Sequence, residues 1–144
     1  MKIRPFVSQD IKHIVSLANR YAAFDSDVSE ADFQPAWSFP GGLLVADDEE
    51  KVIGFVFAYL REVPSEILNR WGASKVAQVE LLAVDSSWRN QGIGRALLEK
   101  LLEVFRDEDV DLVLLHCPAE AIEAKHLYDK LGFEVRAYAM KKKL

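Results

Sequence analysis

A pair of glycines lies between two apolar stretches, where a strand pattern changes to a helix pattern. The stretch RNQGIGRALLEKLL runs from Arg89 to Leu102, and it places Gly92 and Gly94 one residue apart. The first turn of a helix offers unpaired N–H groups and the positive end of the helix dipole, which together bind anions. Because glycine lacks Cβ, a phosphate can approach such a backbone closely. The stretch therefore predicts a phosphate-binding turn.

Two familiar phosphate-binding turns do not fit these residues. A P-loop needs Gly-Lys-Ser/Thr, but Arg95 and Ala96 follow Gly94. A dinucleotide turn needs a third glycine, where this chain has Leu97, and an acid at the end of the next strand, which here ends in His116. A tight turn that uses glycine for conformation alone needs only one glycine. The pair, flanked by arginines, favours anion binding.

Two segments carry a resemblance to a known family. LLAVDSSWRNQGIGRALLEKLL resembles the acetyl-coenzyme A binding segment of the GCN5-related N-acetyltransferases (the GNAT family), with its Arg/Gln-x-x-Gly-x-Gly/Ala pattern after a strand. Downstream, AKHLYDKLGFEV is similar to the family's A-x-x-L-Y-x-x-x-G-F segment. Order and spacing both agree. The resemblance implies a single domain over residues 1–144 that transfers an acetyl group from acetyl-CoA to an amine.

The resemblance also implies how the donor is held. Backbone N–H groups of the glycine turn wrap the pyrophosphate, two arginines add charge, and the end of the preceding strand pairs with the pantetheine where parallel strands splay. A backbone N–H near Leu82 would polarise the thioester carbonyl. Ala121 departs from the family's usual asparagine, which removes one expected contact to the cofactor. The predicted cofactor-binding residues are Leu82, Ala83, Val84, Arg89, Asn90, Gln91, Gly92, Ile93, Gly94, Arg95 and Ala96.

Three side chains are candidates for moving protons. By resemblance, Tyr128 lies near the cofactor sulfur and protonates the leaving thiolate. Glu80 stands in an otherwise apolar strand, on the face expected for Gln78, Leu82 and Val84, where partial burial would make it a better base. The alternative for Glu80 is a solvated or arginine-paired carboxylate. His116 is the rival base, or else a strand-end histidine with one backbone hydrogen bond.

Composition limits the other classes of function. The chain has 144 residues, a net charge of −5 and one cysteine, Cys117, which we expect to be a small buried hydrophobe. Without a basic stripe, neither nucleic-acid nor membrane binding is expected. Apolar runs are too short to span a bilayer, no leader is recognisable, and no residue set has metal-ligand spacing, so we expect a cytoplasmic protein without a metal.

The elements that must position these residues alternate between strands and helices. Helices are predicted after residue 8, at 92–106 and at 121–131, and the 63–74 segment reads as a loop with at most one helical turn. A strand–helix–strand unit implies parallel pairing and the hairpins antiparallel pairing, so the fold class is α/β (α+β), with helices on both faces of a mixed, twisted sheet of about six to seven strands. The predicted strands are Lys2–Phe6, Leu43–Ala46, Val52–Arg61, Val76–Val84, Leu112–His116, Phe133–Arg136 and Tyr138–Lys142.

The acceptor site is expected in the segments outside both motifs. Residues 21–37, 59–62 and 64–72 supply acids and aromatics that suit a cationic amine, either a small molecule or a peptide or protein amine. The alternative is ordinary solvated loops. The sequence also leaves open an acyl-CoA-binding sensor or interaction module with little catalysis, and a homodimer. The residues singled out are Tyr21, Phe24, Asp25, Asp27, Trp37, Glu62, Glu66 and Trp71.

Overall fold

A single five-stranded sheet forms the centre of the molecule. The structure is a computed structural model, and it describes every residue except Phe24 and Glu50, so the expectation for Phe24 lies outside the described residues. The strands lie side by side in chain order. The first three pairs of neighbouring strands are antiparallel, and the last pair is parallel. This confirms the predicted mixed sheet. The strands are β1 (Lys2–Pro5), β2 (Leu43–Asp47), β3 (Val52–Arg61), β4 (Val76–Val84) and β5 (Leu112–Leu115).

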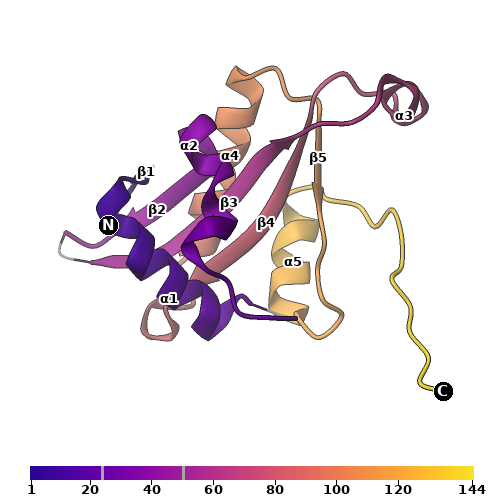
Figure 1. The fold of residues 1–144 in the computed structure, drawn as a ribbon. Coiled ribbons are helices and arrows are strands. Elements are labelled where there is room, and N and C mark those ends of the chain that lie inside the picture. The colour runs from indigo at the N-terminus through magenta and orange to yellow at the C-terminus, as the bar shows by residue number, and fades with distance from the viewer. Residues whose placement is uncertain (24, 50) are drawn as a thin grey trace.

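Helices cover both faces of the sheet (Figure 1). On one face lie α1 (Ile11–Tyr21) and the short α2 (Pro35–Ser38), and on the other lie α4 (Ile93–Asp107) and α5 (Ile122–Lys130). A hydrophobic core lies on each face of the sheet, and strand β3 contributes side chains to both. Phe55 and Phe57 pack toward α1, whereas Ile53 and Val56 pack toward α4. This alternation explains why β3 is apolar on both sides and central. The segment predicted as a loop contains a third helix, α3 (Ser65–Trp71).

The two strands predicted at the C-terminal end are absent from the structure. Residues 133–144 carry no secondary structure, and Figure 1 shows them extending away from the body. The sheet therefore has five strands rather than six to seven. Alternating side chains at 133–140 favour a strand, but a strand exists only where its backbone pairs with a neighbour. Val135 and Met140 are 54% and 91% exposed, so this segment has no such neighbour within the described chain.

Two irregularities in β4 shape the functional region. Phe57 pairs with Leu81 while Ala58 pairs with Val79, so Glu80 is the extra residue of a β-bulge. On the other side, β4 pairs with β5 only from Val76 to Val79. Strand β5 ends there, at Leu115, and Figure 1 shows the chain after it running away from β4, so the second half of β4 has no strand partner on that side among the described residues. This split confirms the splaying that the resemblance implied.

Candidate active site

The glycine turn opens α4 without a side-chain cap. Gly92 is the N-cap residue at φ 76°, and no side chain of the described chain hydrogen-bonds to the cap. The first bond of the helix runs from the Ala96 N–H to the Gly92 carbonyl at 3.0 Å. Asn90 is also left-handed, at φ 63°. A Cβ built on Gly92 meets nothing within 4 Å, so the space beside this residue of the turn is open. This is the geometry of an anion site.

The two arginines beside the turn are engaged elsewhere. Arg95 pairs with Glu99, one helical turn along α4, at 2.7 Å. The Arg89 Nε donates to the Val84 carbonyl at 3.4 Å, and its guanidinium lies 5.1 Å from the centre of the Tyr21 ring. The structure therefore does not bring these charges onto the turn. Exposed pairs of this kind contribute about 0–1 kcal/mol, so either side chain can turn toward a phosphate at little cost.

The start of α4 meets the other motif at the split in the sheet. A Cβ built on Gly94 would lie 3.7 Å from Leu127 on α5, 3.8 Å from Val84 and 4.0 Å from Leu82 on β4. Glycine at this position keeps the helix close to both. The structure thus brings together the glycine turn, the free edge of β4 and the helix that carries Tyr128.

Tyr128 is buried on the α4 and α5 side of the sheet. Its ring makes an edge contact with Phe133 at 5.7 Å between centroids. Burial, with a smaller contribution from the Cys117 charge, raises the pKa of the Tyr128 phenol to about 12. The phenol therefore keeps its proton at neutral pH and can donate it. Burial likewise raises the pKa of the Cys117 thiol, which makes Cys117 a poor nucleophile.

Glu80 shares the face of Gln78, as predicted, but lies on the opposite face from Leu82 and Val84. The bulge adds one residue to β4, so Glu80 points to the side of Phe57 and Leu81, whereas Leu82 packs toward α4. Glu80 is also exposed, not partly buried as expected. Both expectations assumed the strict alternation of a regular strand, which a bulge breaks. As a result, Glu80 and Tyr128 stand on opposite faces of the split.

Tyr59 is the neighbour of Glu80 whose importance the sequence did not reveal. Burial and the negative charge of Glu80 raise the pKa of the Tyr59 phenol, so it is a neutral donor beside the carboxylate. The pairing of Tyr59 with Gln78 places it on the same face as Glu80. Only the register of β3 against β4 shows this. The sequence indicated Tyr59 merely as the start of an acceptor segment.

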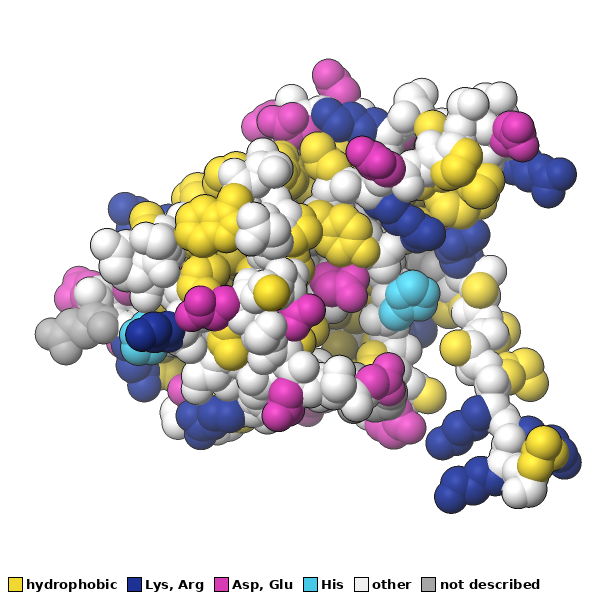
Figure 2. Space-filling model, in the orientation of Figure 1, with side chains coloured by type: hydrophobic (Ala, Val, Ile, Leu, Met, Phe, Trp, Pro, Cys, Tyr) yellow, Lys and Arg dark blue, Asp and Glu magenta, His cyan; other side chains and the backbone are white. Residues whose placement is uncertain are grey.

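A small cavity of about 170 Å³ lies beside Glu80, on the face that α1 and α2 cover. Figure 2 shows acidic side chains gathered on this face of the molecule. The predicted aromatics Trp37 and Trp71 do not line the cavity. A larger cavity of about 630 Å³ lies near Val104 and Glu108, at the far end of α4 from the glycine turn. The smaller cavity is lined by Val28, Asp32, Pro35, Phe57, Tyr59, Glu80 and Leu81.

His116 directly follows β5 at the split, but its hydrogen bonds argue against a role as the base. An Arg61 NH donates to the Gln78 Oε1 at 3.1 Å, which turns the Gln78 amide nitrogen toward His116 Nδ1 at 3.3 Å. Nδ1 then accepts, so the proton of the neutral ring sits on Nε2. That tautomer has no free lone pair facing outward. The geometry therefore favours Glu80 over His116.

The described residues lack two further features. No group of three or more His, Cys, Asp or Glu side chains there is arranged to hold a metal ion. None of the helices in that part of the chain has both the length and the apolar character needed to cross a bilayer.

Known sequences that are similar to this chain are acetyltransferases. A family model described as "Acetyltransferase (GNAT) family" matches residues 9–133. Mycothiol acetyltransferase of Saccharomonospora viridis is 28% identical over 145 residues, which cover 93% of this chain and 46% of that protein. Human N-acetyltransferase 8 is 36% identical over 90 residues, 62% of this chain and 37% of that protein. The chain thus spans less than half the length of these curated relatives.

Solved structures share the fold. A mutant of the BH1408 protein of Bacillus halodurans superposes with a TM-score of 0.82 at 23% identity, over 100% of this chain and 99% of that one. Ard1 from Thermoplasma volcanium superposes with a TM-score of 0.78 at 24% identity, over 94% and 84% of the two chains. A chain of the NatC complex, bound to Gag peptide and CoA, reaches 0.80 at 20% identity, over 95% and 87%. With a family model that covers most of its length and a sheet split in the predicted place, the chain belongs to the acetyltransferase (GNAT) family.

Proposed function

We propose that the protein is an acetyl-CoA-dependent N-acetyltransferase that acts on a primary amine by direct attack in a ternary complex. One observation carries the proposal: the split between β4 and β5 has an uncapped helix N-terminus and Tyr128 on one side, and an acid-lined cavity with Glu80 on the other. A donor and an acceptor bound on opposite faces of the sheet would meet at the split. Membership of an acetyltransferase family supports this arrangement.

The residues present fit the donor. The backbone N–H groups of 91–96 would hold the pyrophosphate, with Arg89 and Arg95 turning toward it, and the free edge at 82–84 would pair with the pantetheine arm. The open space at Gly92 supports this fit. When bound, acetyl-CoA supplies an activated thioester. The NatC complex, one chain of which shares this fold, has been crystallised bound to Gag peptide and CoA.

The cavity beside Glu80 fits a cationic amine. Two carboxylates, Asp32 and Glu80, line a space of about 170 Å³ together with the Tyr59 ring, and acids beside an aromatic face attract an ammonium group. The acceptor class that follows is a small-molecule or peptide amine whose ammonium end fills this cavity. The larger cavity shares Pro35 and Tyr59 with the smaller one. An acceptor that is too long for the smaller cavity can therefore extend into the larger one.

The proton steps follow from the two faces. Glu80, directly or through a water, takes a proton from the ammonium group, and the amine nitrogen then forms its bond to the acetyl carbon. A backbone N–H near Leu82 stabilises the oxyanion. As the carbon–sulfur bond breaks, Tyr128 gives its proton to the thiolate. The nitrogen loses its second proton to water as the amide forms. Tyr128 recovers a proton from water and Glu80 releases the one it took, so the reaction releases one proton overall.

The test is thiol release from acetyl-CoA with a panel of small amines, polyamines and peptides. Turnover on at least one amine, together with thermal stabilisation by CoA, is the expected result. Stabilisation by CoA with no turnover on any amine would instead identify an acyl-CoA-binding module. If CoA gives no stabilisation and no amine gives turnover, the donor site itself is contradicted.

A further inference from the structure

A buried glutamine joins an arginine to a histidine on the face of the sheet that carries the Glu80 cavity. Gln78 is only 4% exposed, and it lies opposite Tyr59 in the pairing of β3 with β4. Its Oε1 accepts a hydrogen bond from Arg61 at 3.1 Å, and its amide nitrogen lies 3.3 Å from His116 Nδ1. A guanidinium can only donate, so Arg61 determines which end of the Gln78 amide faces each neighbour.

Both ends of this hydrogen-bonded chain offer donors. Arg61 gives one N–H to Gln78 and forms no ion pair with a carboxylate of the described residues. Because His116 Nδ1 accepts, Nε2 of the neutral ring carries the hydrogen. Arg61 is exposed and His116 is half-buried, so a ligand can reach both side chains. Two donors, one of them positively charged, suit a group that only accepts hydrogen bonds, which is an anion.

These donors stand next to the acid-lined cavity. Tyr59 lines that cavity and pairs with Gln78. Burial and the Glu80 charge raise the pKa of the Tyr59 phenol, whereas the Arg61 charge lowers it, so both charges act on this phenol. Figure 2 shows acidic side chains, a histidine and basic side chains close together on one face of the molecule. This face therefore presents a site for a cation and a site for an anion side by side.

The spacing of the two sites follows from β4. Gln78 and Glu80 lie two residues apart on one face, and a strand rises about 3.3 Å per residue, so their side chains leave the strand about 7 Å apart. The Arg61 guanidinium also lies 5.8 Å from the centre of the Trp71 ring, a cation–π contact that limits its movement. Trp71 lines neither cavity, but it helps to hold the positive charge at this distance from Glu80.

We propose that the acceptor is an amine that carries a carboxylate about 7 Å from its reacting nitrogen, a distance set by the strand rise. The Arg61 guanidinium and the His116 Nε2–H bind the carboxylate while the ammonium group fills the cavity beside Glu80. A carboxylate suits this place better than a phosphate, whose second negative charge would stand close to the acids of the cavity. The inference rests on the proposed acetyl transfer and names the class of its acceptor, of which an ω-amino acid is the simplest member.

Two probes of equal length test the carboxylate site. They are 5-aminopentanoate and its uncharged twin 5-aminopentanamide, compared by kcat/KM in thiol release from acetyl-CoA. We expect the acid to exceed the amide at least tenfold, because hydrogen bonds between charged groups are about twice as strong as neutral ones. Arg61→Gln should bring this ratio close to one, and Arg61→Lys, which keeps the charge, should restore part of it. Arg106→Gln, at an exposed position on α4 across the sheet, is the matched control and should keep the wild-type ratio.

Binding measured without turnover separates this inference from the proposed reaction. NMR titration of the ¹⁵N-labelled chain with each probe gives a dissociation constant without acetyl-CoA, and the Gln78 side-chain amide signal reports on the carboxylate site. At least tenfold tighter binding of the acid, abolished by Arg61→Gln, would support the site even with no acetylated amine. Equal or undetectable binding of the two probes, or a preference for the acid that survives Arg61→Gln, would overturn the inference and leave the proposed reaction standing wherever an amine is acetylated.

Discussion

Glu80 and Tyr128 divide the proposed proton transfers between two faces of one sheet. The bulge in β4 turns Glu80 toward the acid-lined cavity, and burial keeps Tyr128 protonated on the other side of the split. Neither residue can replace the other, because each reaches a different partner in the reaction. Substituting each residue separately should therefore produce different kinetic defects.

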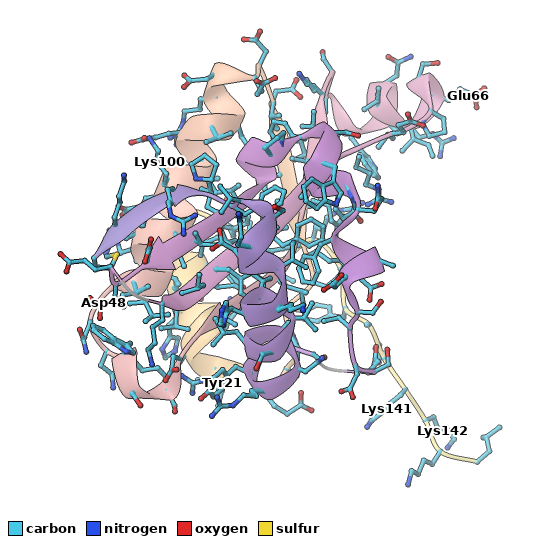
Figure 3. All side chains as sticks on the ribbon, turned by 60° about the vertical axis from the view of Figure 1, so that its left-hand side comes forward. Tyr21, Asp48, Glu66, Lys100, Lys141 and Lys142 are labelled. Atoms are coloured by element: carbon cyan, nitrogen blue, oxygen red, sulfur yellow. The ribbon has the colours of Figure 1, made fainter. Side chains whose placement is uncertain are left out.

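Replacing Glu80 with glutamine should remove the base. We expect kcat/KM at pH 7 to fall about 100-fold, which is the typical contribution of a positioned acid or base. The loss should shrink as pH rises, because a larger fraction of the amine acceptor is then already neutral. The pH profile of thiol release measures this. Glu66→Gln is the matched control, because Glu66 lies on helix α3 (Figure 3) and, contrary to the expectation from the sequence, lines neither cavity. A Glu80→Gln variant with the wild-type profile would assign the base elsewhere.

Replacing Tyr128 with phenylalanine should lower kcat and leave the fold intact. The ring contact with Phe133 is preserved, so we expect the midpoint of thermal unfolding to change little. We expect kcat to fall by about 10- to 100-fold, because the thiolate would leave without a proton donor. Since the pKa of Tyr128 is about 12, the wild-type rate should show no loss from Tyr128 ionisation up to about pH 10. Tyr138→Phe, at an 83% exposed position, is the control.

At the scale of single elements, the start of α4 carries the donor site. Gly92→Glu places a carboxylate where we expect a pyrophosphate, so thermal stabilisation by CoA should disappear. At 100 times the dissociation constant, that stabilisation is about 2.7 kcal/mol. Differential scanning fluorimetry with and without CoA measures it.

The control for this substitution has the same backbone strain. Gly72 ends α3 at φ 66° and, like Gly92, has nothing within 4 Å of a Cβ. Gly72→Glu should therefore lose similar stability but keep the full response to CoA. If Gly92→Glu responds to CoA as strongly as Gly72→Glu does, the donor does not bind at the glycine turn.

A second element-scale prediction concerns the junction of β1, β2 and α1. Burial alone would raise the pKa of Asp10, but hydrogen bonds from the Arg4 guanidinium, at 2.8 Å, and from the Val7 N–H hold it below its usual value. A lowered folded-state pKa stabilises the fold above the unfolded value, about pH 3.9, and this stabilisation is lost as pH falls through the folded value.

Asp10→Asn should therefore destabilise the protein by about 1–3 kcal/mol at pH 7 and lose less additional stability below pH 4 than the wild type. Urea unfolding at pH 7 and pH 3 measures both effects. Asp48→Asn, at the hairpin between β2 and β3, should change neither. Equal losses for the Asp10→Asn variant and the wild type between the two pH values would contradict the role of Asp10.

At the scale of the whole molecule, motif residues were easier to predict than geometry. The glycine turn and the helix that carries Tyr128 follow from local spacing, and the structure brings both to the split. The prediction that Glu80 shares a face with Leu82 and Val84 was wrong, because a bulge depends on pairing between strands that sequence spacing does not encode. The strands expected after Gly132 are absent, because an alternating pattern supplies side chains but no partner edge. Long-range pairing was the missing information in both cases.

The central claim is that the acetyl group passes directly from donor to amine across the split. The most direct measurement is the intact mass of the protein after incubation with acetyl-CoA, alone and with its best amine acceptor, together with thiol release. The account predicts unmodified protein in both samples and thiol release only when the amine is present. An acetyl group found on Cys117 and then passed to the amine would contradict it.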